Sequence, residues 1–366
     1  MNMKLEQTSS IDEETNAVFA CTKKRLKYGS LIVLTFLNVT VVLSMRYSRT
    51  RSQDMFLEGT AVLMAEVMKL FICLCLSYNS PDEGDRDIRK LVSFLHRNII
   101  INKVDTIKVC LPSFMYLIHN NLMYIAADHL DIATYQITYQ LKIMTTAIFT
   151  VLILKRMLNK VQWVSLVFLC LGVAMVQLSS SEDTISLVEK GTRTQYRSLG
   201  FLAALVGCVI SALAAICFEK ILKGSDVSLW MRNIQLSLLG IPLGLFTSFA
   251  HHFQEIKDKG FFFGYDPFVL YIVALHATYG LMVAVVVKYA DNIFKGFAHS
   301  LAVVITCFMS IFIFGRSASL QFVVGAGLVV ISIVMYGGYR PNSSSLPFLS
   351  QAKSIDLKTP KEEEKV

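Results

Sequence analysis

The chain has 366 residues, of which 54% are hydrophobic and only 17% are charged, and its mean hydropathy is +0.53. Soluble domains carry roughly 25% charged residues, so this composition excludes an ordinary soluble fold. The net charge of +8 is spread over loops and tails rather than gathered in one stripe, which argues against nucleic-acid binding.

Apolar runs recur along the chain, each of about 20 residues, the length of helix that crosses a ~30 Å hydrocarbon core. We therefore predict an all-α membrane protein with ten transmembrane helices. They cover residues 28–45, 57–78, 108–127, 132–154, 162–178, 199–222, 230–252, 266–289, 297–315 and 320–337.

The even number of spans places both tails on the same side of the membrane. The tails and the loops on that side hold 20 Lys and Arg residues, against 9 in the loops on the opposite side. Because Lys and Arg favour the cytosolic side, we predict that both tails are cytosolic.

The ten spans divide into two sets of five. The polar stretch 179–198 separates them and predicts a luminal linker between a first half, 28–178, and a second half, 199–340. Because five is odd, the second half would be inserted upside down relative to the first, which is the plan of inverted-repeat transporters. The polar tails, 1–27 and 341–366, are predicted to be disordered.

The span 132–154 carries a single charged residue, Lys142, at its eleventh position. An ammonium at the bilayer centre costs about 2.5–3.5 kcal/mol, so it needs a buried partner or a watery cavity. Aromatic and hydroxyl residues share its helix face: Tyr135, Thr138, Tyr139, Thr145 and Thr146. The opposite face is apolar: Ile137, Leu141, Ile148 and Val151. This stripe predicts a lining for a phosphorylated, ring-bearing ligand, and a Lys paired with a carboxylate on a neighbouring helix is the structural alternative.

Other polar residues interrupt the apolar spans. Glu66 and Lys69 are one turn apart, which predicts an ion pair that either clamps two helices or forms a cavity wall. Asn120 lies one turn after Tyr116, where its amide would contact a base or ribose, or hydrogen-bond a neighbouring helix. For Ser211, which lies in a helix of small residues, close packing is the simpler interpretation.

A second positive charge lies in the other half of the chain, since Lys288 ends the eighth span. A diphosphate that bridges Lys142 and Lys288 would compensate both ammonium groups and couple binding to the relative motion of the halves. The sequence shows no P-loop, GxSxG, HExxH or EF-hand motif, so it predicts neither an enzyme nor a need for a cofactor or metal.

Several segments in chain order resemble the nucleotide-sugar transporters of the Golgi and endoplasmic reticulum, within the drug/metabolite transporter superfamily. They are AEVMKL (65–70), HNNLMYIA (119–126), YQITYQLKIMTTAIF (135–149), FEKILKGS (218–225), WMRNIQL (230–236), FFFGYDP (261–267) and VVVKYADNIFKGFAHSLAVV (285–304). FFFGY and LMVAVVVKYADNI resemble the UDP-galactose branch most, and the UDP-N-acetylglucosamine branch is a near second. Val283 and Ala284 stand where the CMP-sialic acid branch has small hydroxyl residues.

The resemblance implies ten helices, cytosolic tails and exchange of a cytosolic nucleotide sugar, here UDP-galactose and UDP-N-acetylglucosamine, for luminal UMP in the Golgi. It implies phosphate contacts at Lys142 and Lys288 and a nucleobase contact at Tyr135. Further nucleotide contacts are implied at Tyr116, Asn120, Ser211 and Asn233. Glu66 and Lys69 match a pair near the sugar, and Ser237 replaces the tyrosine of some members.

Other interpretations remain open at this point. The same fold would serve a CMP-sialic acid transporter or a drug exporter, although a positively charged cavity disfavours cationic drugs. A membrane-embedded enzyme would need a base or metal cluster that the sequence does not show. The lipid bilayer is an expected partner and nucleic acid is not, while the preferred sugar, homo-oligomerisation, and Golgi or endoplasmic reticulum residence are left undecided.

Overall fold

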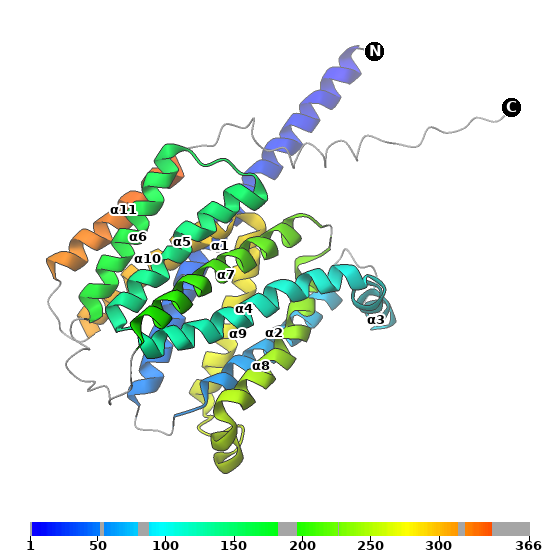
Figure 1. The fold of residues 1–366 in the computed structure, drawn as a ribbon. Coiled ribbons are helices and arrows are strands. Elements are labelled where there is room, and N and C mark those ends of the chain that lie inside the picture. The colour runs from blue at the N-terminus through cyan, green and yellow to red at the C-terminus, as the bar shows by residue number, and fades with distance from the viewer. Residues whose placement is uncertain are drawn as a thin grey trace.

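A computed structural model describes residues 2–51, 55–79, 88–181, 196–225, 227–313 and 319–338 of the chain. Within these ranges every regular element is a helix (Figure 1). The elements are α1 (Asn2–Thr50), α2 (Glu58–Tyr78), α3 (Ile88–His96), the π-helix η2 (Arg97–Ile101), α4 (Lys103–His129), α5 (Ile132–Leu154), α6 (Lys160–Ser181), α7 (Arg197–Lys223), α8 (Leu229–Lys259), α9 (Pro267–Tyr289), α10 (Asn292–Ile313) and α11 (Leu320–Gly338).

Each of the ten predicted spans falls on a helix. The bounds of α5 coincide with the predicted span 132–154, because Asp131 caps its N-terminus by accepting a hydrogen bond from the Thr134 N–H. By contrast, α10 begins five residues before its predicted start at 297. Asp291 accepts a hydrogen bond from the Phe294 N–H, so the helix starts directly after the α9–α10 turn.

Nine helices in the described part of the chain are long and apolar enough to cross a membrane. The helix that contains the predicted span 108–127, α4, is not among the nine. Its first two turns carry Lys103, Asp105 and Lys108, and its middle carries His119 and Asn120, which lower its hydropathy. One of these polar residues, Asn120, lines the cavity of the candidate site.

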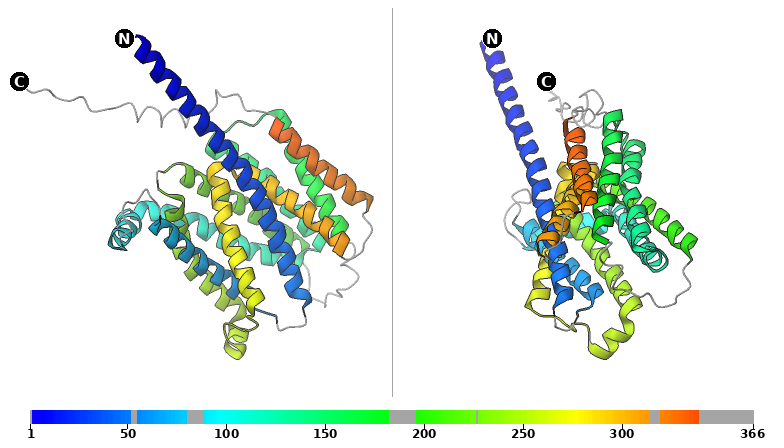
Figure 2. Two further views of the ribbon diagram at one scale, coloured as in Figure 1. Left: turned by 180° about the vertical axis from the view of Figure 1, so that it is seen from behind. Right: turned by 90° about the vertical axis from the view of Figure 1, so that its left-hand side faces the viewer.

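The first helix differs from the prediction, because α1 already begins at Asn2 and so includes most of the predicted disordered tail (Figures 1 and 2). Residues 2–28 contain neither Gly nor Pro, and extending a formed helix costs less than nucleating a new one. The helix α3 lies in a segment predicted as a loop. Most of the predicted linker, 182–195, and the C-terminal tail lie outside the described residues.

The helices pack in two groups around the site. In one group α4 and α5 pack on α7, and α6 packs on α11; in the other α2 packs on α8 and α9, and α1 on α9 and α10. Helices distant in sequence therefore lie side by side, as the two further views in Figure 2 show. On the apolar face predicted for α5, Ile137, Leu141 and Ile148 are 48%, 38% and 44% exposed, whereas Val151 is half-buried.

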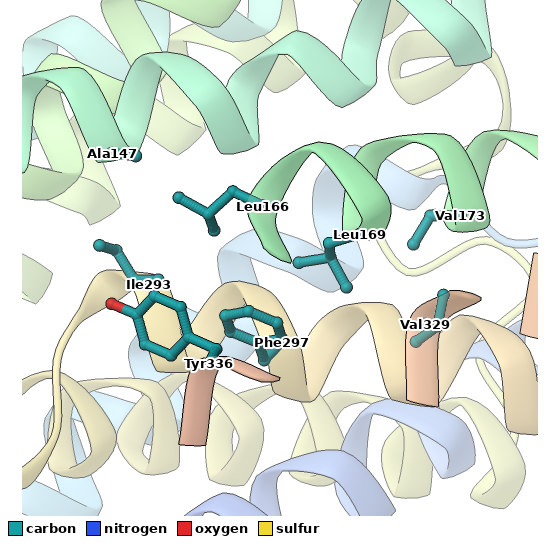
Figure 3. Packing of buried hydrophobic residues seen from close by; sticks show 8 residues of the cluster. All are labelled: Ala147, Leu166, Leu169, Val173, Ile293, Phe297, Val329 and Tyr336. Carbon is teal, nitrogen blue, oxygen red and sulfur yellow. The ribbon is translucent and has the colours of Figure 1, made fainter. Parts of the chain in front are cut away.

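The contact of α6 with α11 depends on two glycines. A Cβ atom on Gly325 would lie 2.8 Å from the Gly172 carbonyl oxygen, and one on Gly172 would lie 2.8 Å from that of Gly325. Small residues let membrane helices approach this closely. The approach seals a buried cluster that joins α5, α6, α10 and α11 (Figure 3): Ala147, Leu166, Leu169, Val173, Ile293, Phe297, Val329 and Tyr336.

Gly325→Ala is therefore expected to lower the melting temperature of the detergent-purified protein by several degrees, because α6 and α11 must move apart to admit the methyl group. Gly327→Ala on the same helix is the matched control, since a Cβ there meets nothing within 4 Å. Equal melting temperatures of the two variants would contradict the proposed role of the close approach.

Candidate functional site: a charged cavity among the helices

A cavity of about 370 Å³ lies between helices of both groups, and residues of α2, α4, α7, α8, α9 and α10 line it. Its polar lining residues are Glu66, Lys69, Ser113, Tyr116, Asn120, Asn233, Thr247, Asn292 and Lys295. Five of the residues predicted from the sequence thus meet in one place: Glu66, Lys69, Tyr116, Asn120 and Asn233.

Glu66 and Lys69 form the predicted ion pair within α2. Lys69 Nζ lies 2.7 Å from Glu66 Oε1 and 2.6 Å from Oε2. Both side chains line the cavity, so the pair is part of its wall. Glu66 also accepts a hydrogen bond from Ser237 of α8, which links α2 to α8.

Two asparagines from different helices line the cavity. Asn120 on α4 lines it, whereas the neighbouring Asn121 donates its amide to the Leu117 carbonyl of its own helix at 2.9 Å. Asn233 on α8 is buried and donates to the Leu229 carbonyl at 2.9 Å, an arrangement that leaves its amide oxygen to accept a ligand donor.

The polar stripe of α5 lies beside this cavity rather than among its lining residues. Tyr135 and Tyr139 stack with ring centroids 6.3 Å apart, and Lys142 Nζ donates to the Tyr139 hydroxyl at 3.3 Å. The hydroxyls of Thr138 and Thr146 donate to carbonyls of α5 itself, so they are less available to a ligand than the sequence suggested.

Lys142 has no carboxylate within 4 Å among the described residues. These residues therefore do not support the alternative in which Lys142 pairs with a carboxylate on a neighbouring helix. Its charge interacts instead with two groups of α10, Lys295 and His299. Like charges held near one another in a membrane protein favour an anion between them.

Lys295 is the functional candidate that the sequence analysis missed. The predicted spans 266–289 and 297–315 leave Lys295 in the loop between them, but it lies in the first turn of α10 and lines the cavity. Lys288, the predicted residue, lies in the last turn of α9 directly after the cavity residue Val287, and it is not itself among the lining residues. Both lysines of KYADNIFK, Lys288 and Lys295, can be recognised in the sequence, but only the position at which α10 begins shows which of them lines the cavity.

Ser211 is placed differently from the other predicted residues. It is fully buried in α7, it is absent from the cavity lining, and its hydroxyl has no hydrogen-bond partner among the described residues. A buried, unpaired hydroxyl costs free energy, so a ligand or water that reached it would be stabilised.

Buried polar contacts tie the two helix groups together where α7 ends and α10 begins. Arg156, in the α5–α6 loop, pairs with Asp291, while Asn292 donates to Glu219 Oε2 at 2.8 Å. Lys223 donates to Glu219 at 2.6 Å and to the Ala290 carbonyl at 2.6 Å. These contacts hold the start of α10, and with it Lys295, against α7.

Asp291 stays ionised in this network. Burial by itself would raise the pKa of the Asp291 carboxyl, but the charges of Arg156 and Lys223 outweigh burial and hold the pKa below its usual value. Its contribution to stability is therefore present above about pH 4 and is lost only as the pH falls through the lower folded pKa.

A second tie joins α4 to α8. Arg232 is fully buried and donates to Asp105 at 2.5 Å and to Gln235 at 2.9 Å. Gln235 in turn donates to the Asn98 carbonyl at 3.1 Å, which satisfies the backbone at the π-helix.

Comparison with known proteins places this architecture in a family. A solved crystal structure of a protein with 12% sequence identity superposes with a TM-score of 0.57, over 85% of this chain and 96% of the other, which shows a shared fold. Residues 22–337 match the nucleotide-sugar transporter profile.

Curated relatives cover most of the chain. The UDP-galactose translocator of Homo sapiens is 44% identical over 333 residues, covering 90% of this chain and 82% of the relative. The UDP-galactose/UDP-N-acetylglucosamine transporter of Caenorhabditis elegans is 41% identical, covering 89% and 86%. The UDP-N-acetylglucosamine transporter of Rattus norvegicus is 40% identical, covering 88% and 98%. The profile match and these identities show that the chain belongs to the nucleotide-sugar transporter family.

Proposed function

We propose that the protein is an antiporter that carries UDP-galactose, and also UDP-N-acetylglucosamine, from the cytosol into the Golgi lumen in exchange for UMP. The names of its relatives support UDP-sugars as cargo. The observation that carries the proposal is the pair of lysines from different halves of the chain: Lys295 lines the cavity, and Lys142, on the neighbouring stripe of α5, has no carboxylate within 4 Å among the described residues.

We propose that ten helices cross the membrane as two inverted sets of five, with both tails in the cytosol. The tenth helix is α4. Among its polar residues, Asn120 lines the cavity and Asp105 accepts a hydrogen bond from Arg232 of α8, so both have polar surroundings within the protein. Its apolar outer residues support this placement, since Leu111 and Phe114 are each 54% exposed.

In the proposed complex the diphosphate lies between Lys142 and Lys295. Lys288 adjoins the cavity residue Val287 but does not line the cavity itself, so its expected contribution is smaller. The nucleoside contacts Tyr135, Tyr116, Asn120 and Asn233, and its ribose or base is within reach of Ser211 after rearrangement. The hexose lies at Glu66 and Lys69, where a carboxylate and an ammonium can pair with its hydroxyls.

Two states alternate during exchange. The ties at Arg156–Asp291 and Arg232–Asp105 hold the helix groups together at the end near the tails, so we propose that they break when the cavity opens to the cytosol. An empty carrier leaves two like charges uncompensated, which disfavours its reorientation and favours obligatory exchange.

Proteoliposomes loaded with UMP are therefore expected to take up labelled UDP-galactose several times faster than empty ones. A panel of UDP-, CMP- and GDP-sugars tests the cargo in the same vesicles. Loading with CMP serves as the matched control, because it preserves the phosphate and changes the base. Equal uptake by empty and UMP-loaded vesicles would refute antiport, and preferential uptake of CMP-sialic acid would refute the proposed cargo.

A further inference from the structure

The Glu66 carboxylate lies against a seat formed by two residues of α8. Ser237, which is fully buried, donates its hydroxyl to Glu66 Oε2 at 3.2 Å. Gly240 faces the same carboxylate, because a Cβ atom there would lie 3.1 Å from Oε2 and 3.5 Å from Cδ. The Glu66 carboxylate therefore accepts one hydrogen bond from Ser237 and occupies the space left by the missing side chain of Gly240.

The carboxylate is held from α2 as well, yet it stays open to the cavity. Lys69 contacts both of its oxygens, and the Lys69 stem packs beside Gly280 of α9, where a Cβ atom would lie 3.5 Å from Lys69 Cδ. The Glu66 side chain is 29% exposed, whereas that of Lys69 is 11% exposed. An ionised carboxylate has about four acceptor positions, so Glu66 can still accept hydrogen bonds from a ligand.

Among the described residues that line the cavity, Glu66 is the only carboxylate. It repels phosphate and attracts hydroxyl donors. Asn233 and Lys295 lie near the beginnings of α8 and α10, at the same end of the bundle, whereas Gly240 is seven residues farther along α8. Ser237 and Gly240, which both contact the carboxylate, lie four and seven residues beyond Asn233, so at 1.5 Å per residue Glu66 is offset from the Asn233 level by about 6–10 Å, which sets a sugar ring apart from the phosphates.

We propose that Ser237 and Gly240 are positioning residues that fix the Glu66 carboxylate for the hexose hydroxyls of a UDP-sugar. They thereby raise the affinity for the sugar nucleotide without affecting UMP, which has no hexose. The inference rests on the proposed function, in that the cargo is a UDP-hexose with its sugar at Glu66.

Competition between UDP-galactose and UMP in UMP-loaded proteoliposomes tests the role of the seat. Ser237→Ala is expected to raise the KM for UDP-galactose about five- to tenfold, with a maximal rate within about twofold of wild type; the effect is smaller than that of a lost hydrogen bond between a charged group and the substrate, because Ser237 acts through Glu66. The inhibition constant of external UMP should stay within about twofold. Ser237→Thr, which keeps the hydroxyl, should restore the KM.

Gly240→Ala is an independent variant, because its methyl group displaces the carboxylate from the other side of the seat. Gly240→Ala should likewise raise the KM for UDP-galactose and leave the inhibition constant of UMP within about twofold. If Ser237→Ala does not fold, Gly240→Ala by itself tests the positioning role. Ser332→Ala is the matched control: this buried serine of α11 donates to the Val329 carbonyl of its own helix at 2.7 Å.

The possible results distinguish failure of the positioning role from failure of the proposed function. An unchanged KM in both seat variants, or an equal rise in the UMP constant, overturns the positioning role. Failure of wild-type protein to take up any UDP-hexose refutes the proposed function instead, so the two failures are distinguishable.

Discussion

Lys295→Ala is expected to reduce UDP-galactose uptake by about 10- to 100-fold, because each hydrogen bond between an ammonium and a phosphate contributes about 1.5–3 kcal/mol. Lys142→Ala should have an effect of the same size, since the two ammonium groups act on one diphosphate. Uptake of labelled UDP-galactose into UMP-loaded proteoliposomes, at matched amounts of monodisperse protein, measures the loss. The UMP inhibition constant should rise as well, because UMP retains one phosphate.

Lys288→Ala is the informative comparison, since Lys288 lies only seven residues away and at the end of α9. Its effect is expected to be smaller than that of Lys295→Ala, because Lys295 lines the cavity and Lys288 does not. Lys295→Arg keeps the charge and should retain part of the activity. A larger loss from Lys288→Ala than from Lys295→Ala would show that the second-half phosphate ligand is Lys288.

Asp105→Ala is expected to destabilise the protein by about 3–5 kcal/mol, because it leaves the guanidinium of Arg232 buried without its carboxylate. The Arg232 side chain is fully buried, and its Nε and Nη2 already have no partner among the described residues. Thermal unfolding in detergent measures the loss as a lower melting temperature. Asp128→Ala, which removes an exposed carboxylate of the same helix, is the control and should change little.

The double variant Asp105→Ala with Arg232→Met separates the two explanations of that loss. Replacing a buried ion pair by apolar side chains is often neutral, so the melting temperature should return toward the wild-type value. A double variant as unstable as Asp105→Ala alone would mean that Asp105 stabilises α4 by some other contact. Transport by a stable double variant would further test whether the tie is needed for the exchange cycle.

The site could be predicted in part. Glu66, Lys69, Tyr116, Asn120 and Asn233 line one cavity, although they come from three helices far apart in the chain. A polar residue inside an apolar span is costly unless it faces protein or water, which is why such residues identify a site from sequence alone. Their roles toward a nucleotide stay predictions.

Lys295 shows why the remainder could not be predicted. The segment KYADNIFK is polar enough to be taken as a loop, and hydropathy cannot place the start of α10 within it. The start depends on Asp291, whose side chain caps the helix, and on Glu219, which accepts hydrogen bonds from Asn292 across 73 residues of chain. Both contacts exist only in the folded bundle.

Hydropathy along the chain suffices to identify a helical membrane protein and to locate its apolar helices, because the bilayer sets the length of each span. The family also follows from the sequence. Which polar side chains meet is apparent only in the folded bundle, since the carboxylate partner of Arg232 is 127 residues away and the residues that hold Glu66 lie on another helix. Packing of distant helices creates those neighbours, and no local pattern encodes them.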